Sequence, residues 1–517
     1  MPIVDTDVIV VGSGFGGAAL ALRLGQAGLR VRIIERGSAI GPPQTRDLLH
    51  QTDAFRQTQD PQYIRKYIKG LGSEHLHFTF AEALGGGSGF YEMASFRAPS
   101  LAFQARDAAQ RPLWPAGLDR KAFDPWYDLA EKMLHIEQVA ASDVPKTGLA
   151  FHQMMKNLDY SCERARYAVQ NCMGSGFCAT GCIYGAKQSL HLNYLAEATR
   201  CGVEIECELD AIDVAAVDAR EATSGDAFDG VPSRYLVRCR RTGSTEVVGY
   251  RAKLVVLAGG TVGTAALLLR SRPGLRHLSD QVGRNVAFNG GVKAAGLLGE
   301  EIVDGDMFTG RSHPGVISYE FLASHGITIT AGKAMPIAAI SGARLRLADE
   351  RRDPDWWGAA HVELMQKYRR RVMALVSFGL TPPDGRITLD GAGKPRVELR
   401  PSADLEMYAR DTMELLHSIF RRNGCRIVTL EWLKGSGEAH QGTYFSTAHQ
   451  TGSARMAASA REGVTDRHGE VFGHPGLYVS DGAAIPSSLA VNTSLTILAN
   501  AERIAVGVRE RYGLVSA

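Results

Sequence analysis

The chain has 517 residues, of which 45% are hydrophobic and 22% are charged, ordinary values for a globular protein. This length allows two or three domains, or one large domain in two parts. The 58 basic and 55 acidic residues leave a net charge of +3, which gives no reason to expect nucleic acid or an anionic membrane as a partner.

The N-terminus and the cysteine content bear on location. The apolar run in "MPIVDTDVIVVGSG" follows acidic residues and is too short for the hydrophobic region of a signal peptide. No run of about 18 apolar residues occurs, so we expect no transmembrane helix. Eight cysteines in a chain of this length, without a signal, favour reduced thiols and a cytoplasmic protein.

The first 37 residues predict one βαβ unit. The stretch "DVIVVGSGFGGAALALRLGQAGLRVRIIERG" contains a buried apolar strand, a glycine turn, a helix over residues 16–28 and a second strand, "VRIIE". Because the glycine turn opens a helix directly after a strand, the unit has the layout of a dinucleotide-binding element.

The glycines of this turn have separate physical roles. Gly12, Gly14 and Gly17 form G-x-G-x-x-G, with Phe15 and Gly16 between them. The first glycine permits the tight turn, the second lets backbone approach a pyrophosphate at the helix N-terminus, and the third lets helix and strand pack closely. Glu35, followed by Arg36, ends the second strand, where a carboxylate would accept hydrogen bonds from an adenosine ribose and repel a 2′-phosphate. The motif alone does not separate FAD from NAD.

The middle of the chain first lacks clear periodicity and then returns to the nucleotide-domain pattern. Residues 38–150 are rich in loops, with helical spacing in the second half of "AGLDRKAFDPWYDLAEKMLHI". Residues 186–200 predict a helix, and strands follow. "KLVVLAGGTVGTAALLLRS" then predicts a strand, a turn that includes Ala258 and Gly259, and a helix.

From about residue 290 to 440 the pattern changes to alternating segments such as "GITITAG" and "ALVSFGL", which predict antiparallel strands. "GRITLDGAGKPRVELRP" predicts a hairpin, and residues 402–424 predict a long amphipathic helix. We therefore predict an α/β protein. A discontinuous Rossmann-like domain (1–290 and 441–517, with loops from 38–150 near the substrate) would contain an inserted α+β substrate-binding domain (291–440) built on an antiparallel sheet.

The two ends of the chain together resemble a known family. "STAHQTGSARM" and "DRHGEVFGHPGLYVSDGAAIPSSLAVNTSLTILANAERIA", with "LGGGSGFYEMASFRAP", "VVLAGGTVGTAALLLRS" and "VGRN", resemble the glucose–methanol–choline (GMC) oxidoreductases. These are FAD-dependent alcohol oxidases and dehydrogenases, and the chain is most similar to their cholesterol-oxidase-like bacterial branch. The resemblance implies an FAD-dependent enzyme.

The resemblance also implies roles for particular residues. His449 would face the flavin ring as the catalytic histidine, with Asn492 as its partner. The "GGGS" loop would run along the flavin, and Asp481 and Gly482 would contact the ribityl chain and pyrophosphate. The cofactor-binding residues expected in all are Gly12, Gly14, Phe15, Gly16, Gly17, Glu35, Arg36, Gly85, Gly86, Gly87, Ser88, Ala258, Gly259, Asp481, Gly482, Asn492, Thr493 and Ser494.

The chemistry can be argued from the residues as well. Alcohol oxidation needs loss of the hydroxyl proton and of a hydride. A neutral imidazole can take the proton, whereas the amide of Asn492 can only hold the hydroxyl. Thr493 or Ser494 could cap the last helix. Some relatives attach FAD through a histidine in the glycine loop, but none occurs between Gly85 and Met93, so we expect noncovalent FAD.

Three cysteines within eleven residues, Cys172, Cys178 and Cys182, leave alternatives open. A structural thiol loop, a disulfide or a zinc site are each conceivable, although zinc usually takes four ligands. The C-x5-C-x3-C spacing also resembles GMC dehydrogenase subunits that carry a [3Fe–4S] cluster and pass electrons to a cytochrome or other acceptor. Such an enzyme would act on a sugar or another polar alcohol.

We therefore expect an enzyme that oxidises a small-molecule alcohol, by branch resemblance a hydrophobic or ring-bearing secondary alcohol. Oxygen or a redox partner would accept the electrons. A flavoprotein that binds FAD without turnover is the alternative from another class. Glu320 could be an additional acid or base, although a surface carboxylate is the simpler interpretation.

Overall fold

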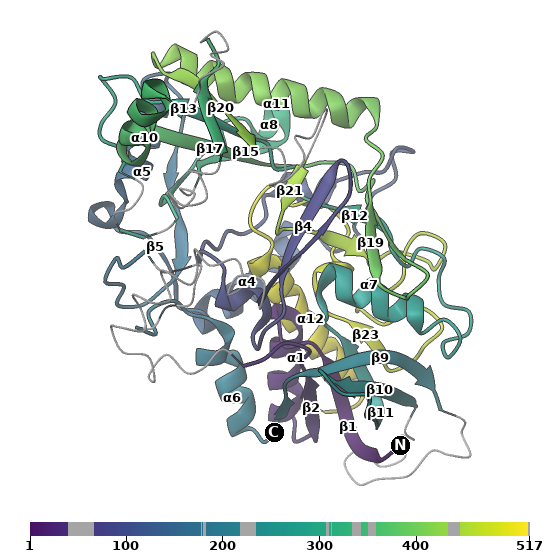
Figure 1. Cartoon of the computed structure of the whole chain (residues 1–517). Coiled ribbons are helices and arrows are strands. Elements are labelled where there is room, and N and C mark those ends of the chain that lie inside the picture. The colour runs from purple at the N-terminus through teal and green to yellow at the C-terminus, as the bar shows by residue number, and fades with distance from the viewer. Residues whose placement is uncertain are drawn as a thin grey trace.

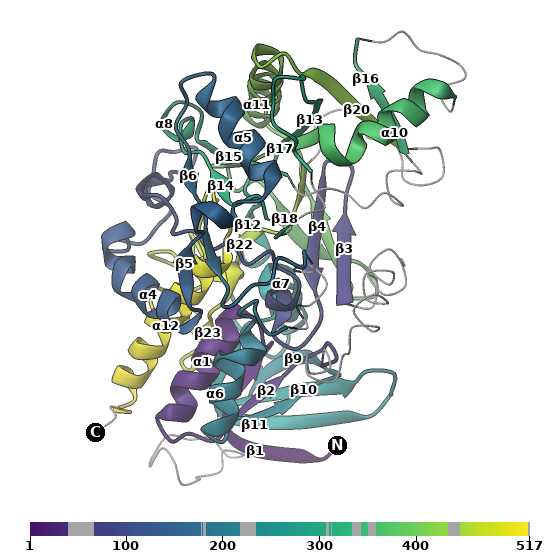
Figure 2. The ribbon, with the colours of Figure 1, turned by 90° about the vertical axis from the view of Figure 1, so that its left-hand side faces the viewer.

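The computed structural model describes residues 1–39, 67–176, 178, 182, 184–217, 234–306, 310–311, 313–332, 343–349, 358–432 and 445–514. Two sheets lie at opposite ends of the molecule, with both termini at the end formed by the N-terminal sheet (Figure 1). The segment 67–190 and the strands between the sheets connect the two ends (Figure 2).

The N-terminal sheet has seven strands in the order β8-β2-β1-β11-β10-β9, and β23 pairs with the C-terminal end of β11, beyond the segment that pairs with β10. Strands β8, β2, β1, β11 and β23 run parallel to one another, whereas β10 is antiparallel to β11 and β9. Its strands are β1 (Ile3–Val11), β2 (Val31–Ile34), β8 (Glu204–Glu206), β9 (Leu209–Ala216), β10 (Tyr235–Arg241), β11 (Val247–Leu257) and β23 (Leu477–Val479).

Helices cover this sheet because its central strands are apolar on both faces. Residues 8–11 of β1 are all buried, as expected of a parallel strand in an α/β fold. Helix α1 (Phe15–Gln26) packs against α12 (Ser494–Arg511) and α6 (Tyr194–Arg200), and α12 also contacts α4 (Arg120–Met133). Helix α7 (Gly260–Arg270) follows β11 in the same way that α1 follows β1. The predicted α/β fold is confirmed.

The second sheet is antiparallel throughout, in the order β15-β17-β13-β20-β16. These strands are β13 (Lys293–Leu297), β15 (Ile327–Ala331), β16 (Ala343–Leu347), β17 (Val372–Gly379) and β20 (Arg426–Trp432). Helix α11 (Ala403–Arg422) packs on one face, where Gly296 leaves room for the ring of Phe420: a Cβ at Gly296 would lie 2.5 Å from that ring. The opposite face is turned toward the N-terminal sheet.

Short elements fill the space between the two sheets and beside them. The paired strands are β3 (Ile68–Gly72), β4 (Leu76–Ala81) and β21 (Phe445–Thr447); β12 (Arg284–Ala287) and β22 (Thr451–Ser453); β18 (Arg386–Leu389) and β19 (Pro395–Glu398); β14 (Val316–Ile317) and β6 (Glu163–Arg164); β5 (Ile136–Gln138) and β7 (Arg166–Ala168). The remaining helices are α5 (Lys146–Lys156), α8 (Leu322–His325) and α10 (Ala359–Arg371), and the 3-10 turns are η2 (Gly86–Gly89), η3 (Ser100–Gln104), η4 (Ala141–Asp143), η6 (Leu190–Leu192) and η7 (Gly482–Ala484).

Most predicted elements form, with one clear error. The hairpin is β18–β19, and the long helix is α11, whose N-cap Ser402 accepts a hydrogen bond from the amide of Leu405. The helix predicted over residues 186–200 is wrong in its first half. Lys187 is paired in an isolated β-bridge with Val169, and α6 begins only after Asn193, whose side chain caps it. A tertiary contact therefore overrides the local helical pattern.

A buried ion pair joins the two central strands of the N-terminal sheet. Asp7 of β1 and Lys253 of β11 have side chains with 0% and 2% exposure, and their charged atoms lie 3.7 Å apart. Asp7 also accepts hydrogen bonds from the backbone and guanidinium of Arg30, at the start of β2. One carboxylate thus fixes the positions of three adjacent strands.

We predict that Asp7→Ala lowers the free energy of unfolding by about 3–5 kcal/mol, because it leaves the ammonium of Lys253 buried with its nearest counter-charge removed. Urea denaturation of the purified variant measures this. The matched control is Asp5→Ala, which breaks a part-exposed pair with Arg251 and should cost less than about 1 kcal/mol. Equal losses in the two variants would contradict the role given to Asp7.

Candidate active site

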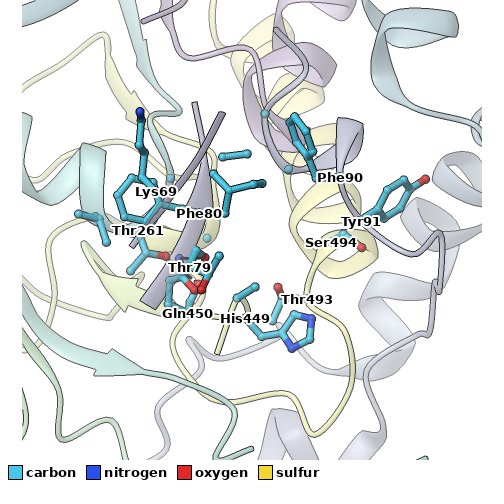
Figure 3. A pocket seen from close by; sticks show the side chains of 18 of the residues that line it. Lys69, Thr79, Phe80, Phe90, Tyr91, Thr261, His449, Gln450, Thr493 and Ser494 are labelled. Carbon is cyan, nitrogen blue, oxygen red and sulfur yellow. Dashed lines mark hydrogen bonds between the residues drawn. The ribbon is translucent and has the colours of Figure 1, made fainter. Parts of the chain in front are cut away.

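A cavity of about 1740 Å³ lies between the two sheets. Its walls combine the glycine turn of α1, the starts of α7 and α12, strands β3 and β4, and the inner face of the antiparallel sheet. In the close-up, the imidazole of His449 lies beside Thr493, and Phe80 and Phe90 project from opposite walls (Figure 3). The cavity is large enough for a dinucleotide and a second small molecule.

The glycine turn has the geometry that its sequence predicts. Gly12 has φ +100°, and a Cβ there would lie 2.3 Å from the carbonyl oxygen of Ala258. A Cβ at Gly17 would lie 2.0 Å from the carbonyl oxygen of Gly12, and one at Gly16 2.4 Å from that of Ser480. A Cβ at Gly14, in contrast, would meet no protein atom within 4 Å. Gly12, Gly16 and Gly17 are thus required by packing, and Gly14 leaves backbone open to the cavity.

Two long helices present uncapped N-termini to this cavity. Gly14 and Thr493 are the N-caps of α1 and α12, and neither helix has a side-chain cap. Phe15, Gly16 and Ser494 of the first turns line the cavity. Thr493 therefore does not cap α12 through its hydroxyl, as the sequence suggested it could. Unsatisfied N–H groups and the positive end of the helix dipole favour an anionic ligand here.

Glu35 lies at the end of β2 and organises the turn around it. Its carboxylate accepts hydrogen bonds from the backbone and hydroxyl of Ser13, at 3.0 and 2.6 Å, and from the amide of Gly37 at 2.7 Å. Burial raises the pKa of Glu35 despite these bonds. Arg36 lines the cavity next to it and pairs with Glu82 of the β4 end.

The glycine loop, residues 85–92, lies next to the glycine turn at the start of α1. Gly86 and Gly87 line the cavity, with Phe90, Tyr91 and Glu92. Gly85 and Ser88 lie outside the lining, as does Gly17 of the turn; Ser88 donates a hydrogen bond to the Gly85 carbonyl at 2.7 Å, and the amide of Gly85 donates one to Ser13 at 2.9 Å. The structure therefore gives these two residues the task of shaping the loop.

The start of α7 meets the C-terminal segment at Asp481. Ala258, Gly259, Asp481 and Gly482 all line the cavity. The carboxylate of Asp481 accepts hydrogen bonds from the Thr264 hydroxyl at 2.6 Å and from the Gly260 and Ala483 amides. Burial raises the pKa of Asp481 to about 6. Asp481 holds the segment after β23 against α7 and thereby helps to close this wall.

His449 and Asn492 come together at the cavity wall although 43 residues separate them in the sequence. The Nδ2 atom of Asn492 lies 3.1 Å from Nε2 of His449. The His449 ring packs edge-on against Phe378 of β17, with ring centroids 5.1 Å apart, and its backbone amide donates to the Thr447 hydroxyl at 2.9 Å. The imidazole is thus held by Asn492 and Phe378, and its backbone by Thr447. Both His449 and Asn492 line the cavity.

The surroundings of His449 favour the neutral imidazole. Burial lowers its pKa to about 4, the positive charge of Lys293 acts in the same direction, and the negative charge of Glu92 opposes them. An unperturbed histidine has a pKa of about 6.5. His449 is therefore a neutral proton acceptor at neutral pH.

A buried amide, Asn289, holds the loop that carries Asn492. Its Oδ1 accepts hydrogen bonds from the amides of Leu489 and Ala490, at 2.8 and 2.9 Å, and its Nδ2 donates to the Val491 carbonyl at 2.6 Å. Ala490 has φ +54°, a strained value for a residue with a Cβ. Asn289 was not among the predicted site residues, although it closely follows the "VGRN" motif.

The antiparallel sheet adds contacts to the same loop. The hydroxyl of Thr328 on β15 donates to the carbonyl of the strained Ala490 at 2.5 Å. Ser488 is hydrogen-bonded to Thr381, which follows β17. The antiparallel sheet thus helps to position the loop that carries Asn492.

The cysteine segment lies next to the glycine loop. All eight cysteines are free thiols. Lys187, which is 2% exposed, donates to the carbonyls of Cys178 and Gly89 at 2.5 and 2.6 Å, and so ties the cysteine segment to the glycine loop. Across the described residues, no three His, Cys, Asp or Glu side chains gather closely enough to hold a metal ion. The disulfide alternative is wrong, and these contacts match a structural loop.

Two charged residues, Glu320 and Lys293, lie in different surroundings. Glu320 is exposed and accepts hydrogen bonds from Ser161, outside the cavity lining, in line with a surface carboxylate. Lys293 lines the cavity and was not predicted. The signal available was a single charge at the head of the apolar strand "KAAGL".

Comparison with protein families decides the relationship of the chain. A family model described as GMC oxidoreductase matches residues 6–289, and a C-terminal model with the same description matches residues 382–501. The chain belongs to the GMC oxidoreductase family. This confirms the resemblance that the motifs indicated and, with it, the expectation of an oxidoreductase. GMC oxidoreductases bind FAD.

The curated relatives are distant and longer. An uncharacterized GMC-type oxidoreductase of Mycobacterium tuberculosis is 29% identical over 65% of this chain and 49% of its own length. A cholesterol oxidase of Acinetobacter baumannii is 24% identical over 55% and 54%, and a long-chain-alcohol oxidase of Arabidopsis thaliana is 23% identical over 61% and 40%. The chain therefore aligns with about half the length of the first relatives.

Solved structures support the fold over the full length. Pyridoxine 4-oxidase from Mesorbium loti has a TM-score of 0.65 at 17% identity, covering 98% of this chain and 99% of its own. Formate oxidase from Aspergillus oryzae has a TM-score of 0.67 at 15% identity, covering 100% of both chains. Among the described helices, none is long and apolar enough to cross a membrane.

We predict that Asn289→Ala frees the loop before Asn492. The variant loses three buried hydrogen bonds, so its free energy of unfolding should fall by about 2–4 kcal/mol, at about 1 kcal/mol for each bond. Peptides covering residues 488–492 should exchange amide hydrogen faster by mass spectrometry. Asn157→Ala, which removes an exposed amide contact with Asn423, is the control and should change neither. Unaltered protection of residues 488–492 would show that Asn289 does not hold them.

Proposed function

We propose that this protein is an FAD-dependent oxidoreductase that oxidises an alcohol to a carbonyl, with His449 as the base and Asn492 as its partner. The observation that carries the proposal is the His449–Asn492 pair, 3.1 Å apart at the wall of a cavity that also contains the glycine turn and two uncapped helix N-termini. This pair provides a proton acceptor next to a site suited to a dinucleotide.

The residues present fit FAD. The open position above Gly14 would receive the pyrophosphate at the N-terminus of α1, and Glu35 would meet the adenosine ribose. Gly86 and Gly87 would flank the flavin, and the N-terminus of α12 would favour negative charge on its reduced form. No histidine lies in the glycine loop, which supports noncovalent binding. Bound FAD would supply the hydride acceptor, flavin N5.

His449 would take the hydroxyl proton on Nε2. A neutral imidazole is required for this step, and the burial that lowers its pKa keeps it in that form. The edge-on contact with Phe378 and the backbone hydrogen bond to Thr447 restrict the ring, so little orientation remains to be lost when substrate binds.

Asn492 would orient the reacting hydroxyl. Its Oδ1 is buried and has no hydrogen-bond partner in the described part of the chain. An unpaired amide oxygen costs about 1–3 kcal/mol, so a donor group of a bound cofactor or substrate beside Oδ1 would be favourable. A substrate hydroxyl between the two side chains would accept a hydrogen bond from Nδ2 of Asn492 and donate its single proton to Nε2 of His449.

The cavity and the relatives also bear on the substrate and on the electron acceptor. The apolar inner face of the antiparallel sheet and the named activities of the relatives support a hydrophobic or ring-bearing secondary alcohol as substrate. Oxygen or a redox partner would accept the electrons, in the cytoplasm.

We also propose that residues 1–290 and 441–517 form the FAD-binding domain and residues 291–440 the substrate-binding domain. The hydrogen bonds of Lys187 to the Cys178 and Gly89 carbonyls support a structural role for the cysteine segment.

We predict that His449→Ala retains FAD but reduces the flavin more slowly by about 10²–10⁴, the usual contribution of a general base. Anaerobic stopped-flow bleaching of the flavin by a panel of alcohols measures this. His468→Ala, at an exposed position outside the cavity lining, is the control and should reduce the flavin at the unmodified rate. Equal rates in the His449 variant and the parent would remove His449 from the mechanism.

We also predict the acid limit of the reaction. Because the base acts when deprotonated and its pKa is lowered to about 4, kcat/KM should stay level from about pH 8 down to about pH 5.5 and decline only below that. The limit for an unperturbed histidine would lie near about 6.5. A decline centred near that ordinary value would mean that the environment of His449 does not depress its pKa.

A further inference from the structure

One charged residue, Lys293, stands on the part of the inner face that β13, β15 and β17 form; on β20 the same face carries Arg426, which pairs with Asp349 and lies outside the cavity lining. Residues paired across antiparallel strands project to the same side, and Lys293 of β13 pairs with Val376 of β17, which pairs with Thr330 of β15. All three line the cavity. The other residues on this face of β13, β15 and β17 are neutral: Ala295, Leu297, Thr328, Val372, Ala374 and Phe378.

The side chain of Lys293 lines the cavity. It is exposed by surface area, yet burial lowers its pKa, as expected of a lysine that projects into a cavity. Among the residues that the structure describes, no acidic group opposes this effect on the pKa of Lys293. Within the described residues it forms no hydrogen bond or ion pair, in contrast to the buried Lys187 and Lys253. An ammonium in such a place gains from a negatively charged partner.

Lys293 lies near the reacting end of the cavity. Phe378, two residues from Val376 on the same face, contacts the His449 ring, and the charge of Lys293 acts on His449. Titratable groups that line the cavity outside the predicted cofactor-binding residues include Lys69, Glu92, His313, Tyr368, Lys394 and His417. Burial lowers the pKa of both His313 and His417, so neither adds a positive charge at neutral pH.

We propose that Lys293 binds a carboxylate of the substrate, so that the preferred alcohol is a hydroxy acid with an apolar body. This rests on the proposed function, since it assigns the substrate of the same cavity. One ammonium matches the single charge of a carboxylate, whereas a phosphate dianion would call for several donors. The neutral face around Lys293 would contact the apolar body, and the hydroxyl would reach His449.

The test uses FAD-loaded protein and two measurements. Calorimetry compares the binding of cyclohexanecarboxylate with that of neutral cyclohexanecarboxamide, neither of which can be oxidised as an alcohol. Anaerobic flavin reduction compares 4-hydroxycyclohexanecarboxylate with its methyl ester. Lys293→Met removes the charge at similar length, and Lys293→Arg keeps the charge.

In the unmodified protein the carboxylate should bind more tightly than the carboxamide. Lys293→Met should lower the carboxylate-to-carboxamide affinity ratio and the acid-to-ester ratio of reduction efficiency by about 10–100-fold, the range for a hydrogen bond to a charged group. Lys293→Arg should restore most of both ratios. A general effect of Lys293 on His449 or the flavin would change both members of each pair and leave the ratios unaltered.

Unaltered ratios in Lys293→Met, or no measurable binding of cyclohexanecarboxylate, would overturn the proposal. The two proposals fail separately. If no alcohol reduces the flavin but carboxylate binding depends on Lys293, the oxidation is wrong and the anion site stands. If alcohols reduce the flavin without preference for the acid, the oxidation stands and the role of Lys293 is wrong.

Discussion

The hydrogen bonds that hold residues 488–492 are the constraint on which the candidate site depends. Asn289 accepts hydrogen bonds from two amides of this segment and donates one to a carbonyl, and the hydroxyl of Thr328 donates to the carbonyl of the strained Ala490. An αL conformation at a residue with a Cβ persists only where surrounding contacts outweigh its cost. These contacts come from the segment after β12 and from the antiparallel sheet, whereas α12, which follows Asn492, packs against α1 beside the N-terminal sheet. The position of Asn492 therefore depends on both ends of the molecule.

The electrostatics of the cavity follow from the burial of the groups that line it. Removing water disfavours charge, which keeps His449 neutral and raises the pKa of Asp481 and Glu35. The same effect makes an enclosed ammonium costly unless a ligand compensates it. The helix N-termini act in the opposite direction for anions: that of α1 lies at the glycine turn, and that of α12 directly follows Asn492. One cavity thus has a part suited to a dinucleotide and a part suited to an apolar molecule.

The cysteine segment illustrates how a conspicuous motif can serve the fold. The buried ammonium of Lys187 donates hydrogen bonds to the backbone carbonyls of Cys178 and Gly89. This joins the segment to the glycine loop that lines the cavity. Lys187 also explains the false helix prediction over residues 186–189, because its β-bridge with Val169 and its buried hydrogen bonds to carbonyls outside this segment hold the chain out of a helix there. Local periodicity contains no information about such long-range partners.

The sequence by itself determined the βαβ unit, the strand-turn-helix at Gly259, the hairpin, the long helix and the family, because each depends on residue types at short, regular spacing. It also indicated His449 and Asn492 through motifs. Only the tertiary structure decided that Asn289 positions the Asn492 loop, that Glu320 lies at the surface and that Lys293 faces the cavity. These facts depend on strand register and on contacts between segments far apart in the chain, such as Asn289 with Ala490. A one-residue change of register would turn Lys293 to the other face of its sheet.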